Sequence, residues 1–175
     1  QHADVAPWIA RAAAPWLEQT RGNLAAMLKN GRLAHALLLL GAPGAGQAEI
    51  AIWLAERLLC ERRPEAPCGR CAGCRLFKAG NHPDFRWIRV REDKKEISIE
   101  QIRDLSEALA LKSFRGGAKL ALIDPAEAMT ALSFNALLKT LEEPAGETWL
   151  LLATGRSERL PRTIASRCAK IRLPL

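Results

Sequence analysis

Short hydrophobic runs alternate along the chain with longer segments in which hydrophobic residues recur every three or four positions. The short runs are typical of buried strands, and the longer segments are typical of helices with one apolar face. The predicted strands cover residues 36–40, 84–90, 119–124, 148–154 and 169–175. The predicted helices cover residues 15–30, 47–60, 97–111, 133–144 and 160–167. This alternation predicts an α/β domain with a five-stranded parallel sheet flanked by helices.

Polar residues and prolines mark the ends of several predicted elements. Ser98 and Ser133 stand at the starts of two helical segments, where a hydroxyl accepts a hydrogen bond from a free backbone amide, so we predict that both are N-caps. Pro144 is expected to end the second of these helices. Arg86 and Arg89 interleave with apolar residues in the strand at 84–90, as expected of a strand near a sheet edge.

The first predicted strand runs into the glycine-rich stretch GAPGAGQA. A working phosphate loop follows the pattern G-x-x-x-x-G-K-[ST], in which the lysine reaches the β- and γ-phosphates and the hydroxyl binds Mg²⁺. Gly41 and Gly46 have this spacing, with Gly44 between them, but the next two residues are Gln47 and Ala48. An ordinary tight turn would also contain such glycines. The position between a strand and a helix favours a degenerate phosphate loop without its cation and metal ligand.

Two further polar residues end predicted strands, Asp124 and Thr154. Because ligands of such sheets bind beyond the carboxyl ends of the strands, we expect both residues near the glycine loop. In ATPases of this architecture the Asp supports the metal, and a neighbouring Glu positions the attacking water. Here Pro125 follows Asp124 directly, and Glu127 lies three residues beyond it, so we expect its carboxylate to project elsewhere. The sequence therefore predicts no ATP hydrolysis by the usual route.

Four cysteines lie within one short stretch, CERRPEAPCGRCAGC, with the spacing C-x7-C-x2-C-x2-C. Four thiolates suit a closed tetrahedral Zn²⁺ site, and Gly69 and Gly73 permit the tight turns that aim the sulfurs inward. An iron–sulfur cluster would be suggested by a fourth cysteine after the triplet, followed by proline, and disulfides are unusual in the cytoplasm. The spacing favours a structural zinc module, and Cys168 is too distant to belong to it. The predicted zinc ligands are Cys60, Cys68, Cys71 and Cys74.

Composition narrows the class of protein. The 175 residues suffice for one α/β domain, alone or with a small appendage, and no apolar run approaches the length of a membrane span. We expect a cytoplasmic protein without membrane contact. The formal net charge of +7 suits contact with nucleic acid or with an acidic partner, although a merely basic surface explains it equally well. Arginines gather only around the cysteines, at positions 62, 63, 70 and 75.

Arg167 stands between the last predicted helix and the last predicted strand, in the stretch SRC. In isolation it would be an ordinary surface arginine. On the edge of a nucleotide-binding type of domain, an arginine can instead reach the site of a neighbouring subunit and stabilise charge on the transferring phosphoryl group, an effect of roughly 10³–10⁵ in rate. Its planar guanidinium suits phosphate better than lysine does.

The stretches GRLAHALLLLGAPGAG, SFNALLKTLEEPAGETWLLLAT and SRC, with the four cysteines, resemble one known family. It is the amino-terminal AAA+ domain of bacterial DNA polymerase III clamp-loader subunits, and the resemblance runs from about residue 15 to the end. ATPase subunits of that family carry a complete phosphate loop and a Glu after the strand's Asp. Gln47, Ala48 and Pro125 depart from this pattern, which points to the family's non-hydrolysing member.

The resemblance implies a P-loop NTPase-like (AAA+) fold over residues 1–175, with a zinc module at about residues 60–75. The family's lid and collar domains are expected to be absent from this chain. Thr154 falls near the family's sensor-one position. The implied protein is a component of the DNA polymerase III holoenzyme in the bacterial cytoplasm, within the nucleoid-associated replication machinery.

The resemblance further implies a subunit that sits beside ATPase subunits in a hetero-pentamer and supplies Arg167, as an arginine finger, to a neighbour's ATP. Using that ATP, the assembly would place a sliding clamp on primed DNA. Two alternatives remain open at this point. One is an ATP-binding clamp-loader ATPase subunit that tolerates Gln47. The other is a zinc-containing DNA-binding module that uses the arginines around the cysteines.

Overall fold

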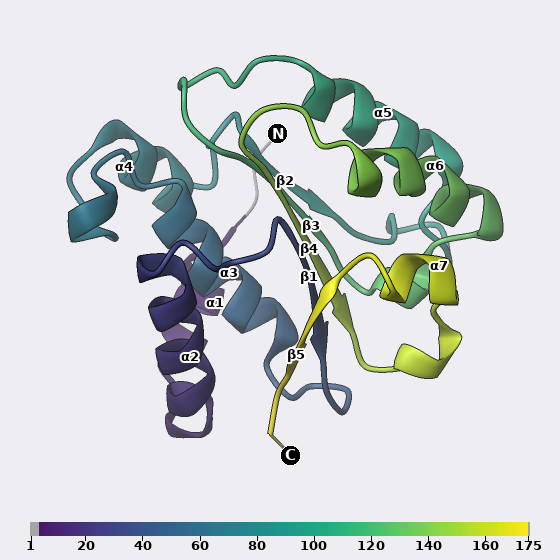
Figure 1. Ribbon diagram of the computed structural model, residues 1–175, viewed down its shortest axis with the longest axis horizontal. Helices are drawn as coiled ribbons and strands as arrows, with labels where there is room; N and C mark the ends of the chain where they lie inside the picture. The colour runs from purple at the N-terminus through teal and green to yellow at the C-terminus, as the bar shows by residue number, and fades with distance from the viewer. Residues whose placement is uncertain (1–3, 175) are drawn as a thin grey trace.

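The structure, a computed structural model, describes residues 4–174 and contains one sheet of five parallel strands (Figure 1). The strand order is β2-β3-β4-β1-β5, so β2 and β5 are the edges. The strands are β1 (Ala36–Leu40), β2 (Phe85–Ile88), β3 (Lys119–Ile123), β4 (Thr148–Thr154) and β5 (Ala169–Arg172). The predicted five-stranded parallel α/β sheet is confirmed, as is the edge position of the arginine-containing strand.

Helices cover both faces of the sheet. Figure 1 shows α1, α2 and α3 on one face and α5, α6 and α7 on the other. The α-helices are α1 (Ala6–Arg11), α2 (Glu18–Lys29), α3 (Gln47–Leu58), α4 (Ala72–Lys78), α5 (Ile99–Ala110), α6 (Ala131–Glu142) and α7 (Arg162–Ala165). Short 3₁₀ turns are η1 (Pro15–Leu17), η2 (Arg63–Glu65), η3 (Ala126–Ala128) and η4 (Ser157–Arg159). The helices α1 and α4 were not predicted, since both are too short to show a clear apolar period.

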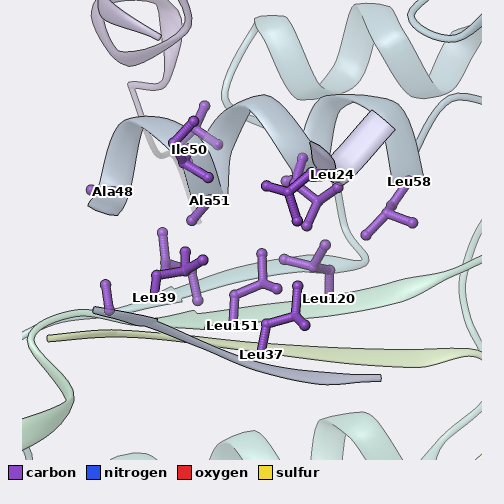
Figure 2. Packing of buried hydrophobic residues seen from close by; sticks show 14 of the residues in the cluster. Leu24, Leu37, Leu39, Ala48, Ile50, Ala51, Leu58, Leu120 and Leu151 are labelled. Atoms are coloured by element: carbon purple, nitrogen blue, oxygen red, sulfur yellow. The ribbon is translucent and has the colours of Figure 1, made fainter. Parts of the chain in front are cut away.

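The hydrophobic core has two layers, one on each face of the sheet, because successive residues of a strand point to opposite faces. Leu37 and Leu39 of β1 face α3, whereas Leu38 and Leu40 face the layer formed by α5 and α6. Figure 2 shows the first of these layers, in which α3 side chains such as Ile50 lie over the leucines of the sheet. All five residues of β1 are buried, and each fully buried leucine stabilises the fold by roughly 1.5–3 kcal/mol.

The predicted N-cap at Ser98 is confirmed, but the one at Ser133 is wrong. The Ser98 hydroxyl accepts from the Gln101 amide at 3.2 Å, and the Gln101 side chain accepts from the Ser98 amide at 3.0 Å. Thr130 caps α6 instead, with its Oγ1 3.1 Å from the amide nitrogen of Ser133. Ser133 is buried inside the first turn, where its hydroxyl donates to the carbonyl oxygen of Ile97 at 2.9 Å.

Most predicted elements extend slightly beyond the observed ones. The helix predicted at 47–60 ends at Leu58, and the strand predicted at 84–90 covers only Phe85–Ile88. The strand predicted at 169–175 ends at Arg172, and Leu175 lies outside the described residues. Among residues 4–174, no helix has the length and apolar content that crossing a membrane requires.

Candidate functional site

A cavity of about 450 Å³ opens at the carboxyl ends of β1, β3 and β4. The structure brings Gly44, Gln47, Ala48, Asp124 and Thr154 together in its lining, although they come from three separate stretches of the sequence. Gly41 and Gly46 belong to the same loop but are not among the lining residues. The residues expected around a phosphate loop therefore meet at one place.

Two glycines of the loop have backbone conformations that favour glycine. Gly44 has φ +81° and Gly46 has φ +113°, both in the left-handed region. Gly46 is also the N-cap residue of α3, and a Cβ there would lie 3.0 Å from the methyl groups of Leu17. The loop therefore favours glycine at both positions and lies against Leu17 of the N-terminal segment.

Gln47 occupies the place of the phosphate-loop lysine, and its side chain turns into the protein. The side-chain Nε2 donates to the carbonyl oxygens of Ala42 and Thr154, each at 3.0 Å, and the residue is buried. Both N–H bonds of the amide are therefore engaged within the chain. The next residue, Ala48, offers only a methyl group, so the two positions that hold lysine and a hydroxyl in a working loop supply neither a cation nor an oxygen ligand.

The expectation that Glu127 projects elsewhere is wrong. The 3₁₀ turn η3 folds the chain back after β3, so Glu127 lines the same cavity as Asp124. Thr154 Oγ1 donates to Glu127 Oε1 at 2.6 Å. Burial, and to a lesser extent the negative charge of Glu127, raise the pKa of Asp124 to about 6. Thr154 therefore binds a carboxylate of its own chain.

The remaining charges in the cavity come from residues that sequence reasoning missed. Arg11 lies in α1, with its Nε 3.3 Å from a carboxylate oxygen of Glu49 and its guanidinium 4.3 Å from the ring centre of Trp8. Arg156 also lines the cavity. The only hint of the α1 contribution in the sequence is a proline at the start of a short apolar segment, APWIAR.

The four predicted zinc ligands come together at the amino end of α4. Their sulfur atoms all lie within 4.8 Å of one another. The pairs Cys68–Cys74 and Cys60–Cys71 have Sγ–Sγ distances of 4.0 Å. With Zn–S bonds of about 2.3 Å, tetrahedral geometry separates the sulfurs by about 3.8 Å, so this donor set fits Zn²⁺.

Backbone groups around the cysteines stabilise thiolates. The amides of Arg70 and Cys71 donate to Cys68 Sγ at 3.4 and 3.2 Å, and they lower the pKa of Cys68 to about 6. Burial raises the pKa of Cys74. A Cβ on Gly73 would lie 2.3 Å from the carbonyl oxygen of Leu59, so only glycine fits this turn.

Several arginines near the cysteines pair with carboxylates of the same chain. Arg115, from the loop before β3, holds Glu61 through two hydrogen bonds of 2.9 and 3.1 Å. Arg63 pairs with Glu147, and Arg70 lies 3.2 Å from a carboxylate oxygen of Glu65. The pairs of Arg115 and Arg63 attach the module to the rest of the domain, and all three pairs reduce the positive charge that a DNA-binding module would need.

Arg167 lies at the other end of the sheet from the cavity. Ala169, two residues later, pairs with Leu37 near the start of β1, whereas Thr154 pairs with Leu40 at its end. The Arg167 side chain is exposed; its Nε donates to Glu142 Oε1 at 3.0 Å and its Nη1 to the Thr163 carbonyl oxygen at 2.8 Å. Arg167 therefore does not serve the cavity of its own chain.

A family model described as DNA polymerase III, delta subunit, matches residues 16–175. The chain belongs to this family. Its curated relatives include DNA polymerase III subunit delta' of Escherichia coli K12, 40% identical over 155 residues, or 88% of this chain and 46% of that protein. The delta' subunit of Pseudomonas aeruginosa PAO1 is 41% identical over 162 residues, which cover 92% of this chain and 48% of that protein.

A third relative belongs to another subunit type. DNA polymerase III subunit tau of Escherichia coli K12 is 42% identical over 151 residues, or 86% of this chain and 23% of that protein. The chain spans about half the length of the delta' relatives that it matches. The departures at Gln47, Ala48 and Pro125 point to delta' among the clamp-loader subunits, and the names of the relatives confirm this resemblance.

Solved structures support the fold. A DNA polymerase III gamma subunit-related protein of Thermotoga maritima superposes with a TM-score of 0.61 at 20% identity, covering 91% of this chain and 46% of that one. The RuvB Holliday junction branch migration motor of the same organism gives 0.53 at 18% identity, covering 91% and 44%. At such identities the likeness concerns the fold alone, and it agrees with the predicted P-loop NTPase-like (AAA+) fold.

Proposed function

We propose that this chain is the AAA+ domain of a DNA polymerase III delta' subunit that does not hydrolyse ATP and acts on a neighbour's ATP through Arg167. The neighbour is an ATPase subunit of a hetero-pentameric clamp loader, which places a sliding clamp on primed DNA. The similarity to tau supports this arrangement, because it indicates that the same type of domain recurs in another polymerase III subunit.

The residues in the chain's own cavity support the proposal that it does not hydrolyse ATP. ATP hydrolysis requires a cation at the β- and γ-phosphates, a ligand for Mg²⁺ and a base or water-positioning group. Gln47 donates both amide hydrogens to backbone carbonyls, and Ala48 has no oxygen in its side chain. Glu127 accepts a hydrogen bond from Thr154, and Asp124 has a raised pKa. The lysine and the hydroxyl of a working phosphate loop are therefore both missing, although the carboxylates of Asp124 and Glu127 remain in the cavity.

The position of Arg167 is the observation that supports its action on a neighbour's ATP. It is exposed at the opposite end of the sheet from its own cavity, just before the edge strand β5. A guanidinium in this position can meet phosphate only on another molecule. In a clamp loader it would stabilise the charge that develops on the transferring phosphoryl group.

The proposal includes a structural Zn²⁺ held by Cys60, Cys68, Cys71 and Cys74. Four thiolates close the coordination shell, so the metal would supply folding stability and no catalysis. The contacts of Arg115 with Glu61 would transmit that stability to the loop before β3.

The proposal is tested by ATP turnover in a clamp loader reconstituted from the full-length protein, its ATPase partners, the clamp and primed DNA. Arg167→Ala should reduce kcat by roughly 10³-fold or more without loss of the complex. Arg162→Ala, which removes another exposed arginine from α7, is the matched control and should leave kcat unchanged. Equal turnover of the two variants would refute the role of Arg167.

A further inference from the structure

We propose that Glu142 is a positioning residue for Arg167, which holds the guanidinium in the orientation that a neighbour's phosphate requires. This inference rests on the proposed function of Arg167 and extends it to a second side chain. Glu142 is the last residue of α6, and Arg167 follows α7, 25 residues later. The two residues belong to separate stretches, LEEP and SRC.

Within residues 4–174, some N–H donors of the Arg167 guanidinium are engaged, and the others are free to contact a ligand. Nε–H donates to Glu142 Oε1 at 3.0 Å, and one N–H of Nη1 donates to the Thr163 carbonyl oxygen at 2.8 Å. A guanidinium has five N–H donors. In the part of the chain that the structure describes, the second N–H of Nη1 and both of Nη2 have no acceptor. These two nitrogens form a fork that suits bidentate contact with a phosphate.

Both acceptors that hold Arg167 belong to packed elements. Leu141, next to Glu142, is buried, and its carbonyl oxygen lies 3.0 Å from His35 Nε2. Thr163 precedes Ile164, which is fully buried in the layer under α6 and α7. The guanidinium is therefore held from two directions, by a backbone carbonyl of α7 and by a side chain at the packed end of α6, which is an arrangement that preorganises a functional group.

The exposure of the pair argues against a mainly structural role. The side chains of Arg167 and Glu142 are 37% and 50% exposed. Ion pairs in such surroundings contribute little to folding stability, because water and salt screen them. The contact therefore has a larger effect on where the guanidinium lies than on whether the domain folds.

Glu143 provides a matched control. It directly follows Glu142, is also exposed, and has no side-chain hydrogen bond or ion pair among the described residues. Replacing either glutamate with glutamine removes one negative charge from the same surface. Only the change at position 142 replaces the charged acceptor of Arg167 Nε with a neutral and weaker one.

The test uses the reconstituted clamp loader with full-length protein and measures kcat and KM for ATP. Glu142→Gln should lower kcat roughly tenfold with little change in KM, because a misplaced group loses transition-state contact more than substrate binding. Glu142→Asp should recover part of the loss, and Glu143→Gln should behave as wild type. In an Arg167→Ala background, Glu142→Gln should have no further effect.

The outcomes separate the two proposals. If Arg167→Ala reduces kcat but Glu142→Gln does not, Arg167 keeps its role and the inference about Glu142 is overturned. If Glu142→Gln costs as much in the Arg167→Ala background as alone, Glu142 acts on the structure and not through Arg167. If Arg167→Ala leaves kcat unchanged, the proposed function fails, and the positioning role fails with it.

Discussion

The side-chain amide of Gln47 lies 3.0 Å from the carbonyl oxygen of Thr154 and joins the glycine loop to the carboxyl end of β4. A lysine in a working phosphate loop points toward the nucleotide, whereas this glutamine points into the protein. The loop therefore keeps its shape through a contact within the chain. Gln47 therefore has a structural contact at the position where a working loop has its lysine.

This view predicts a stability cost for Gln47→Ala. The substitution leaves the carbonyl oxygens of Ala42 and Thr154 without the donor that the buried amide supplies. We expect the free energy of unfolding to fall by about 1–3 kcal/mol in chemical denaturation. Gln19→Ala, at an exposed position of α2, is the control and should change it by less than about 0.5 kcal/mol. Equal stability of the two variants would contradict the structural role of Gln47.

The raised pKa of Asp124 predicts that the free energy of unfolding depends on pH. An unfolded aspartate loses its proton near pH 3.8, whereas burial keeps the proton on folded Asp124 up to about pH 6. Between these values the folded state binds more protons than the unfolded state, so stability present below about pH 4 is lost as the pH rises through 6. Asp124→Asn removes this loss and should be more stable than wild type by about 1–3 kcal/mol at pH 7.

The measurement is the difference between the wild-type and Asp124→Asn unfolding free energies across pH 4–7. That difference should grow with pH and level off above pH 6. Asp104→Asn, at an exposed position of α5, should follow the wild-type curve. A flat difference for Asp124→Asn would show that the carboxyl is not desolvated as the fold requires.

The cysteine module predicts about one equivalent of zinc by elemental analysis of carefully prepared protein. Cys71→Ser should lose the metal and lower the melting temperature, because folding and metal binding are coupled in closed thiolate sites. Cys168→Ala, which removes a buried cysteine outside the module, should keep a full equivalent although it also loses some packing. Zinc well below one equivalent in the wild-type protein would argue against the site.

The sequence predicts the sheet well because buried parallel strands are nearly continuous apolar runs, as in β1. It also predicts which residues end those strands and so meet at the cavity. Ser133 was misassigned because Thr130, three residues earlier, is an equally good cap by type, and only the tertiary hydrogen bond from the Ser133 hydroxyl to the Ile97 carbonyl oxygen distinguishes them. The sequence alone does not show that η3 turns Glu127 back toward Thr154.

The contact between Arg167 and Glu142 depends on tertiary structure in the same way. Each residue belongs to a stretch that identifies the family, yet no spacing rule connects a helix end to a side chain 25 residues later. Their proximity arises because α6 and α7 pack side by side over the same layer of the core.

The central claim is that the chain acts by completing a neighbour's site, and ATP turnover of the assembled clamp loader carrying Arg167→Ala tests it most directly. The assembly should remain intact by size-exclusion chromatography while kcat falls by roughly 10³-fold or more. An intact assembly with wild-type kcat would contradict the claim and would leave Arg167 as a surface residue paired with Glu142.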